Sequence, residues 1–349
     1  MTDEVLISVE GGAGRIRLNR PKAIHALNKA MCDAMIDALV AWRDDPAVRV
    51  VLIDHAEGRG FCAGGDIRMI AESGAGDGVA ARAFFRSEYR LNHLLFTYPK
   101  PIVAFMDGIT MGGGVGISQP ARYRIATERT MYAMPESGIG LFPDVGGGWY
   151  LSRLPGRTGQ FLALTGARID GADCVALGLS THYVPSDALD GLKARLAAAP
   201  QDAEAILAAA TAEPPAAKIV ADRERIDGLF ASDVLEEVIA ALEADGSEWA
   251  AKELATLRTK SPQTCKVSLR LLAQGRDHAD FADEMRVEFR VAAHLCQRHD
   301  FIEGVRALII DKDNSPKWDP ATPEGVSDGL VDQIFAPLPA DEEWQPLAL

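Results

Sequence analysis

Features that define several common functional classes are scarce in this sequence. Among 349 residues, 36 Lys and Arg stand against 50 Asp and Glu, which gives a formal net charge of −14. A protein that binds nucleic acid through its phosphates needs a basic face, so this balance argues against that activity. No uncharged apolar run is long enough to span a bilayer. We therefore expect neither nucleic acid nor a membrane as a partner.

Cysteine is also scarce, and its spacing is irregular. The five cysteines are odd in number and never form a C-x-x-C pair, which indicates reduced, buried thiols rather than a disulfide framework. The first residues, Met-Thr-Asp-Glu-Val-Leu-Ile, are acidic, with no basic n-region and no Arg-rich leader. From these observations we expect a cytoplasmic protein.

Familiar catalytic and cofactor motifs are missing as well. There is no G-x-x-x-x-G-K-[ST] loop, no G-x-S-x-G elbow and no H-E-x-x-H pair. The glycines from Gly112 fail the dinucleotide pattern because Ile117 stands at its last position. Asp311–Pro316 imitates a calcium loop, but Pro316 and Thr322 stand where that loop requires Gly and Glu. We expect no metal and no separate cofactor.

The first part of the chain alternates strand and helix patterns. Val5–Val9 and Arg15–Leu18 predict a hairpin, and the β-branched run Val50–Asp54 predicts a buried strand. A long amphipathic helix is predicted over Val79–Tyr98, followed by a strand over Ile102–Met106. This alternation is typical of an α/β fold.

The composition changes after about residue 186, where alanine, leucine and charged residues predict mainly helices. We therefore expect a core over residues 1–190, which carries ligand binding and catalysis, and a helical region over 191–349 that packs on it. The acidic tail Pro337–Leu349 contains several prolines, and we expect it to dock only loosely.

Two glycine-rich stretches contain the residues that suggest a reaction. Gly112-Gly113-Gly114 follows a predicted strand and opens a helix, where free N–H groups and the helix dipole favour an anion. In the second stretch Glu136 and Asp144 lie eight residues apart in a segment otherwise poor in charge. Donors for an oxyanion beside an acid/base pair are what acyl-group chemistry requires.

Plainer explanations remain open at this point. Three glycines also make an ordinary tight turn, and Asp144 is suited to cap the helix that follows it. Phe61–Asp66 is either a simple loop or the source of the second N–H donor that an oxyanion hole needs.

Taken together, the motifs resemble the crotonase (enoyl-CoA hydratase/isomerase) superfamily over nearly the whole chain. The stretches that carry the resemblance are Asn19–Asn28, Phe61–Ile67, Gly108–Gly116, Met134–Gly148, Leu162–Gly166, Gly304–Asp313 and Ser315–Trp318. The resemblance implies an α/β spiral of β-β-α turns with a mainly helical C-terminal region. It also implies an acyl-CoA thioester as ligand, with CoA as part of the substrate.

The resemblance assigns roles to particular residues. Backbone N–H groups of Gly65 and Gly113 would hold the thioester oxygen, and Glu88 matches a substrate-contacting glutamate. For Glu88, a surface charge on an amphipathic helix is the plainer explanation. The remaining substrate-binding positions, near the nucleotide and pantetheine parts of CoA, would be Lys22, Ala23, Ala63, Asp66 and Ile67.

Departures from the hydratase pattern decide which reaction we expect. Gly116 stands where a hydratase has its first glutamate, Glu136 matches the second, and Asp144 replaces a usual glycine. This exchange agrees with a hydrolase subgroup in which the matching Glu and Asp are catalytic. We therefore expect hydrolysis of a short branched 3-hydroxyacyl-CoA, namely 3-hydroxyisobutyryl-CoA, in valine breakdown.

Two other functions stay open on the sequence alone. One is an enoyl-CoA hydratase or isomerase on the same scaffold, and the other is a non-catalytic member of the superfamily that binds RNA. The oligomeric state is open too. Family members form trimers and hexamers, whereas a helical C-terminal region would cover the exposed face within one chain.

Overall fold

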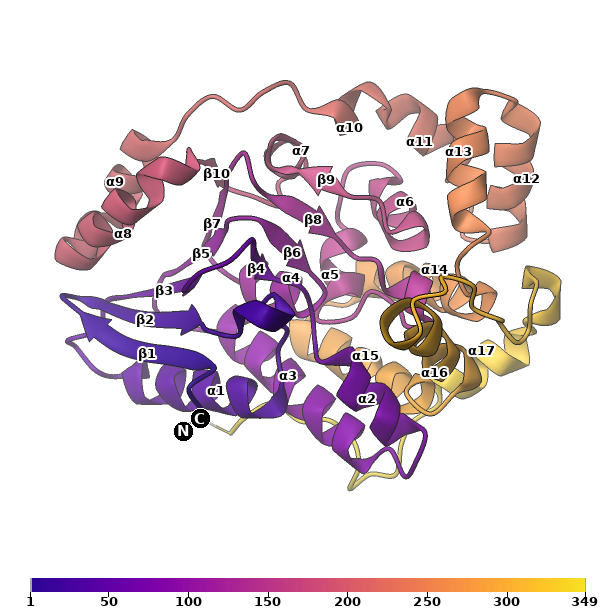
Figure 1. Cartoon of the computed structure of the whole chain (residues 1–349), viewed down its shortest axis with the longest axis horizontal. Helices are drawn as coiled ribbons and strands as arrows, with labels where there is room; N and C mark the ends of the chain where they lie inside the picture. The colour runs from indigo at the N-terminus through magenta and orange to yellow at the C-terminus, as the bar shows by residue number, and fades with distance from the viewer. Residues whose placement is uncertain (1, 349) are drawn as a thin grey trace.

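The computed structural model describes residues 2–348, with the strands in the middle and the helices around them (Figure 1). Within these residues the strands form two sheets. The larger sheet has the order β1 (Val5–Glu10), β2 (Ala13–Leu18), β3 (Val50–His55), β5 (Ile102–Met106), β7 (Tyr123–Ala126), β10 (His182–Tyr183). The smaller has the order β4 (Gly60–Cys62), β6 (Ile109–Met111), β8 (Met131–Ala133), β9 (Ile169–Asp170).

From β3 to β8, successive strands alternate between the two sheets. β3, β5 and β7 run parallel in the larger sheet, while β4, β6 and β8 run parallel in the smaller one. Each pair is followed by helical structure, so every turn of the chain adds one strand to both sheets. β3 and β5 are almost wholly buried, as their β-branched runs predict for strands covered on both faces. The expected α/β fold with a spiral of β-β-α turns is confirmed.

Short and long helices connect the strands of the spiral. Asn28 caps the first of them, accepting a hydrogen bond from the Met31 N–H at 2.9 Å. The helices of this part are α1 (Lys29–Arg43), α2 (Ile67–Gly74), α3 (Val79–Phe96), α4 (Gly113–Ser118), α5 (Gly147–Leu151), α6 (Thr158–Thr165) and α7 (Gly171–Ala176).

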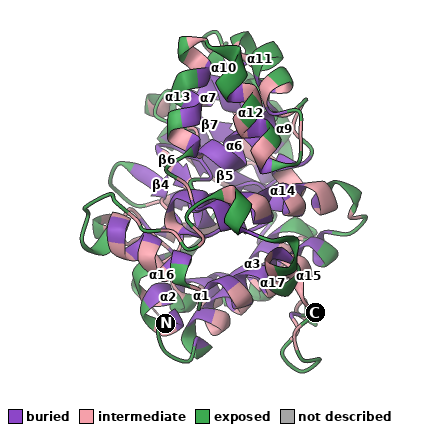
Figure 2. Ribbon diagram, turned by 90° about the vertical axis from the view of Figure 1, so that its right-hand side faces the viewer, coloured by how far each residue is buried: buried purple, intermediate pink, exposed green. Residues whose placement is uncertain are grey.

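From β10 to residue 348 the described chain adds helices and no further strand. They are α8 (Leu189–Ala198), α9 (Ala203–Ala210), α10 (Lys218–Ala221), α11 (Arg223–Leu229), α12 (Leu235–Asp245), α13 (Glu248–Leu257), α14 (Pro262–Asp277), α15 (Phe281–Leu295), α16 (His299–Val305) and α17 (Asp328–Phe335), with a π-helix over Arg306–Ile310. α14 packs on α5 and α6, and α15 packs on α3. Figure 2 shows buried strands in the middle and exposed outer faces on α10 and α11.

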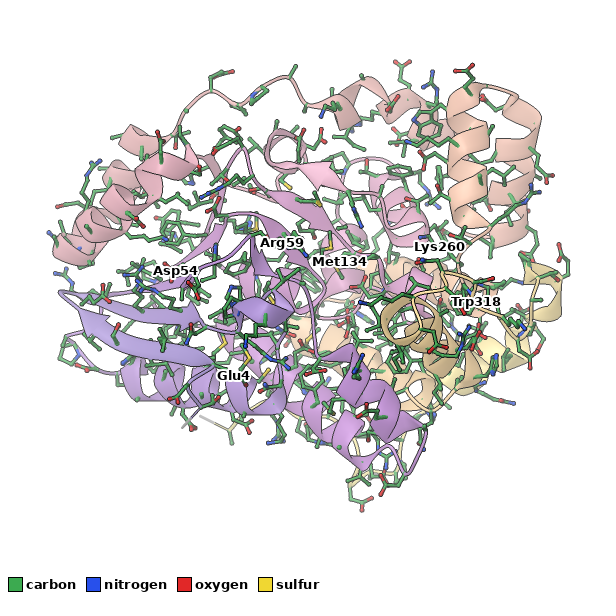
Figure 3. The ribbon with its side chains drawn as sticks, in the orientation of Figure 1. Glu4, Asp54, Arg59, Met134, Lys260 and Trp318 are labelled. Atoms are coloured by element: carbon green, nitrogen blue, oxygen red, sulfur yellow. The ribbon has the colours of Figure 1, made fainter. Side chains whose placement is uncertain are left out.

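The chain after α16 crosses back over the helices. Trp318 donates its Nε1–H to the Thr259 carbonyl at 3.1 Å and lies beside Lys260 (Figure 3). This crossing brings the last part of the chain toward α3 and α15.

The expectation of a loosely docked tail is wrong. Trp344 is completely buried and meets the ring of His93 on α3 edge-on. Arg86 and Arg90, also on α3, donate to the carbonyls of Glu343 and Gln345 at 2.9 and 3.1 Å. The tail is polar in composition. The Trp344 side chain and the backbone carbonyls of Glu343 and Gln345 nevertheless anchor it.

All five cysteines are buried as free thiols in the described chain, as their scatter predicts. No helix within residues 2–348 has the length and apolar character needed to cross a bilayer.

Candidate active site

The site forms at one edge of the smaller sheet. β4, β6 and β8 are parallel, so the residues that follow their carboxyl ends meet at the same edge. Ala63-Gly64-Gly65 follows β4, Gly112-Gly113 follows β6, and Glu136 follows β8. Segments far apart in the sequence are brought together by this register alone.

A cavity of about 320 Å³ opens at this edge. Apolar side chains make up much of its wall, including Phe84 and Phe85 from α3 and Leu308 and Ile309 from the π-helix. Seven of the residues predicted from the sequence line it: Ala63, Gly65, Ile67, Glu88, Gly113, Glu136 and Asp144.

Lys22, Ala23 and Asp66 are not among the described residues that line this cavity. Asp66 instead caps α2, accepting from the Met69 N–H at 3.3 Å, and pairs with Arg20 at 2.7 Å. Lys22 is exposed on a short turn nearby. Arg20 also contacts Glu4 at 3.2 Å, so acidic partners already balance its charge.

Backbone pairing leaves the predicted N–H donors, which belong to residues lining the cavity, without a backbone partner in the described chain. The Leu27 N–H donates to the Gly64 carbonyl, and the Asp66 N–H donates to the Leu27 carbonyl, both at 2.8 Å. Gly65 lies between these two bonds, and its own N–H takes no backbone partner in the described chain. Gly113 is the first residue of α4, where N–H groups have no partner within the helix.

Three carboxyl residues, Glu88, Glu136 and Asp144, line the cavity together with these glycines, and each is at most 5% exposed. Tyr89 donates its hydroxyl to Asp144 Oδ2 at 2.7 Å. A Cβ added to Gly113 would stand 2.6 Å from Glu88 Oε1, and one added to Gly112 would stand 3.1 Å from Glu136 Oε1. Glu88 Oε1 and Glu136 Oε2 have no hydrogen-bond partner among the described residues. The carboxyl groups therefore face the same small space as the donors.

Burial shifts the ionisation of all three groups. It raises the pKa of Asp144 to about 6, although the Tyr89 hydrogen bond works against this rise. Burial and then the charge of Asp144 raise the pKa of Glu136 well above its usual range. The pKa of Glu88 is raised by burial, then by Asp144 and Glu136. Because their charges act on one another, the three groups titrate together and not as independent sites.

The sequence did not point to Tyr89. It directly follows Glu88, and adjacent residues on a helix point about 100° apart, so one would expect only one of them to serve the site. The fold makes use of both, because α3 lies between the glycine turns and the loop of Asp144.

No set of three or more His, Cys, Asp or Glu side chains in residues 2–348 is arranged to hold a metal ion. The expectation that the reaction needs no metal or cofactor stays a prediction.

Comparison with known proteins places this geometry in a family. A family model described as Enoyl-CoA hydratase/isomerase matches residues 13–335. The chain belongs to that family. Its curated relatives include the mitochondrial 3-hydroxyisobutyryl-CoA hydrolase of Gallus gallus, which is 43% identical over 96% of this chain and 89% of the relative. That of Danio rerio is 44% identical, with 96% and 90% covered.

Solved structures of the family agree with the fold. A carnitinyl-CoA dehydratase from Mycobacterium thermoresistibile has a TM-score of 0.93 at 42% identity, covering 97% of this chain and 98% of that one. An enoyl-CoA hydratase from Rhodobacter sphaeroides 2.4.1 has a TM-score of 0.91 at 40% identity, covering 98% and 100%. The crotonase resemblance seen in the motifs is thereby confirmed.

The expectation of a cytoplasmic location is wrong. The relatives from Gallus gallus, Danio rerio and Homo sapiens are all named as mitochondrial proteins. The expectation was drawn from the acidic first residues, and the lack of a leader pattern there carries no information about the compartment.

Proposed function

We propose that this chain hydrolyses 3-hydroxyisobutyryl-CoA to 3-hydroxyisobutyrate and CoA, a step of valine breakdown. The proposal depends on one observation: an acid/base side chain is present at Asp144 and is missing at the position where a hydratase has its first glutamate. Asp144 lines the cavity together with Glu136, while the hydratase glutamate position is Gly116. The curated relatives with 40–44% identity over nearly the whole chain are hydrolases of this thioester.

Gly65 and Gly113 polarise the thioester in this proposal. Their N–H groups donate to the carbonyl oxygen and hold the negative charge that develops on it. Each such donor lowers the barrier by about 3 kcal/mol in a site closed to water. Ala63 and Ile67 line the same cavity and contact the acyl or pantetheine part. Lys22, Ala23 and Asp66 lie outside this cavity, where the nucleotide part of CoA extends.

Glu136 performs the attack by one of two routes. In the first, its carboxylate adds to the thioester carbon, CoA leaves as a thiol after taking a proton, and water hydrolyses the mixed anhydride. In the second, Glu136 takes a proton from water as the water oxygen adds to the same carbon; the C–S bond then breaks and CoA leaves as a thiol after taking a proton. Asp144 and Glu88 bind the substrate hydroxyl or exchange the protons that either route moves.

Replacement of the attacking carboxylate tests the proposal. Glu136→Gln keeps the volume of the side chain and removes its charge, so we expect CoA release to fall by about 10³-fold. Free thiol is measured with a chromogenic thiol reagent, with 3-hydroxyisobutyryl-CoA compared against straight-chain and unsaturated acyl-CoA esters. Glu72→Gln, an exposed glutamate on α2, is the matched control. Unchanged thiol release by Glu136→Gln would rule out the assigned role.

A hydratase or dehydratase is the second candidate, because the two solved relatives with 40–42% identity carry those descriptions. Incubation with crotonyl-CoA separates the two reactions. Loss of the conjugated absorbance without free thiol favours water addition, whereas thiol release from 3-hydroxyisobutyryl-CoA favours hydrolysis.

A further inference from the structure

The loop that carries Asp144 holds an unusual backbone conformation. Val145 has a φ of +54°, and Gly146 follows with a φ of +91°. Glycine adopts such angles freely, but a β-branched residue does so at a cost of about 1–3 kcal/mol. Val145 is 1% exposed, so no solvent contact stabilises it there. A conformation of this kind persists only where surrounding groups hold it.

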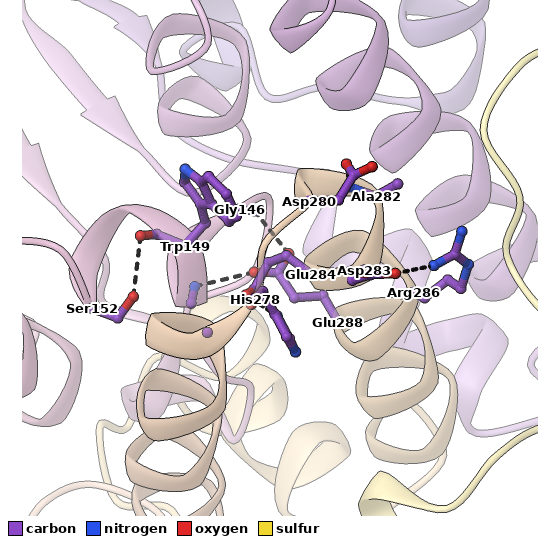
Figure 4. A network of polar contacts seen from close by, with 12 residues as sticks. Gly146, Trp149, Ser152, His278, Asp280, Ala282, Asp283, Glu284, Arg286 and Glu288 are labelled. Carbon is purple, nitrogen blue, oxygen red and sulfur yellow. Dashed lines mark hydrogen bonds and ion pairs between the residues drawn. The ribbon is translucent and has the colours of Figure 1, made fainter.

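Glu288 of α15 is the group that holds this loop. Its Oε2 accepts from the Gly146 N–H at 2.8 Å, and its Oε1 accepts from the Gly148 N–H at 3.1 Å. Figure 4 shows Glu284 and Glu288 on one helix beside the loop of Gly146. Glu288 is completely buried, and both of its oxygens bond to backbone that lies two and four residues beyond Asp144.

We propose that Glu288 is a positioning residue for the hydrolysis: it holds the left-handed turn at Val145 and so keeps the Asp144 carboxylate on the Tyr89 hydroxyl. The assignment to hydrolysis rests on the proposed function, whereas the hold on the loop rests on the geometry alone. Glu288 itself touches backbone and stays outside the residues that line the cavity among those described.

The surroundings of Glu288 oppose its ionisation, and its two hydrogen bonds to backbone favour it. Glu284 lies one turn earlier on α15 and pairs with His278 at 2.8 Å, while Asp144, Tyr89 and Tyr150 lie close from other elements. Burial and then Glu284 raise the pKa of Glu288, and the two N–H groups oppose that rise. A carboxyl side chain has two oxygens that accept from the two N–H groups, whereas an amide side chain has one.

Glutamine at this position tests the proposal while keeping the volume. Glu288→Gln offers one acceptor oxygen and sets an NH₂ group against the second N–H donor. We expect kcat to fall by about 100-fold, the loss typical of a displacement near 1 Å. KM is expected to stay within about threefold, because the Gly65 and Gly113 donors lie on other elements. Glu284→Gln, which leaves both loop bonds in place, is the matched control. Unchanged kcat in Glu288→Gln overturns the proposal.

A second substitution separates positioning from simple packing. Glycine at position 145 adopts the left-handed turn freely. Adding Val145→Gly to Glu288→Gln should therefore raise kcat at least tenfold above that of Glu288→Gln alone. Val145→Ala removes nearly as many atoms but keeps the backbone penalty, and it should restore none. Equal effects of the two substitutions overturn the proposal. So does a Glu288→Gln/Val145→Gly protein that fails to fold, because Glu288 would then serve stability alone.

A crystal structure of Glu288→Gln shows the conformation of the loop that carries Asp144, and it needs no substrate. We expect the Tyr89 hydroxyl and Asp144 to separate beyond hydrogen-bond distance. If they stay within it, the positioning role is wrong, whatever the substrate. If the unmodified protein releases no CoA from any thioester while this separation is seen, the proposed function fails and the hold on the loop stands.

Discussion

Glu88 lies in an environment that suits catalysis and lowers stability. It is 2% exposed and shares its cavity with Asp144 and Glu136. Burial and these two charges raise its pKa well above the usual range. In the unfolded chain the same side chain ionises in water at its ordinary pKa. Above that pKa, folding must therefore either bury a charge or bind a proton, and both reduce the free energy of unfolding.

We predict that Glu88→Gln stabilises the protein in a pH-dependent manner. At pH 8 the unfolded chain gains stability from ionising Glu88, and the substitution removes this gain. The free energy of unfolding should rise by about 1 kcal/mol or more, the scale of a tenfold change in an ionisation constant. At pH 4, where the side chain is largely protonated in both states, the benefit should vanish. Thermal unfolding at the two pH values measures the effect.

The exposed Glu72→Gln should change stability at neither pH, and it serves as the control. A benefit of Glu88→Gln that is as large at pH 4 as at pH 8 would contradict the assignment to ionisation. Activity is expected to fall in the same variant.

At the scale of residues, the sequence predicts the groups that belong to short motifs. Glu136, Asp144, Gly65 and Gly113 lie in contiguous stretches whose pattern can be read directly, and the structure brings them to one cavity. Glu288 belongs to no such stretch. It contacts the site across 140 or more residues of sequence, and a residue pattern carries no information on which distant helix faces which loop.

At the scale of elements, the loop before α5 packs directly against Gly116 of α4. A Cβ added to Gly116 on α4 would stand 2.6 Å from Val145 Cβ and 2.7 Å from Asn92 Nδ2. Glycine at 116 thus admits Val145, and with it the turn that presents Asp144. The lack of a carboxylate at position 116 and the presence of one at position 144 thus both follow from the packing of Val145 against Gly116.

We therefore predict that Gly116→Glu does not convert this protein into a hydratase. The new side chain would displace Val145 and the loop of Asp144, so thiol release should fall more than about 100-fold. Crotonyl-CoA hydration should stay at background, and both reactions are measured on the same preparation. Gly228→Ala, at a helical glycine with nothing within 4 Å of an added Cβ, is the control. Efficient hydration by Gly116→Glu would contradict this account.

The strand and helix patterns predict elements well where apolar periodicity is strong, as in β3, β5 and α3. They fail at β4, because the glycines on either side of Phe61–Cys62 read as a loop. β4 forms because β6 pairs with it from a later turn of the spiral. Only the tertiary structure supplies that partner.

At the scale of the whole molecule, the tail closes the structure from the outside. Trp344 is completely buried against α3, although the residues on either side of it are more exposed. Composition alone suggested a loose tail, because one tryptophan among acidic residues and prolines barely changes an average. A single large side chain nevertheless contributes much of the apolar area that such a segment buries.

Trp344→Ala is expected to lower the free energy of unfolding by about 3 kcal/mol, as for other buried aromatic residues reduced to alanine. Urea denaturation measures this loss. Gln345→Ala, an exposed neighbour that keeps its carbonyl for Arg90, should change it by no more than about 0.5 kcal/mol. A loss below about 1 kcal/mol for Trp344→Ala would contradict the tight docking.

Helix α3 has contacts on two sides. Glu88 lines the cavity and Tyr89 donates to Asp144, whereas Arg86 and Arg90 donate to the tail. If the segment after Pro337 were removed, every reacting group would remain, but α3 would lose the carbonyl partners of Arg86 and Arg90. Support for the Glu88 and Tyr89 side chains therefore depends in part on residues that never touch the substrate.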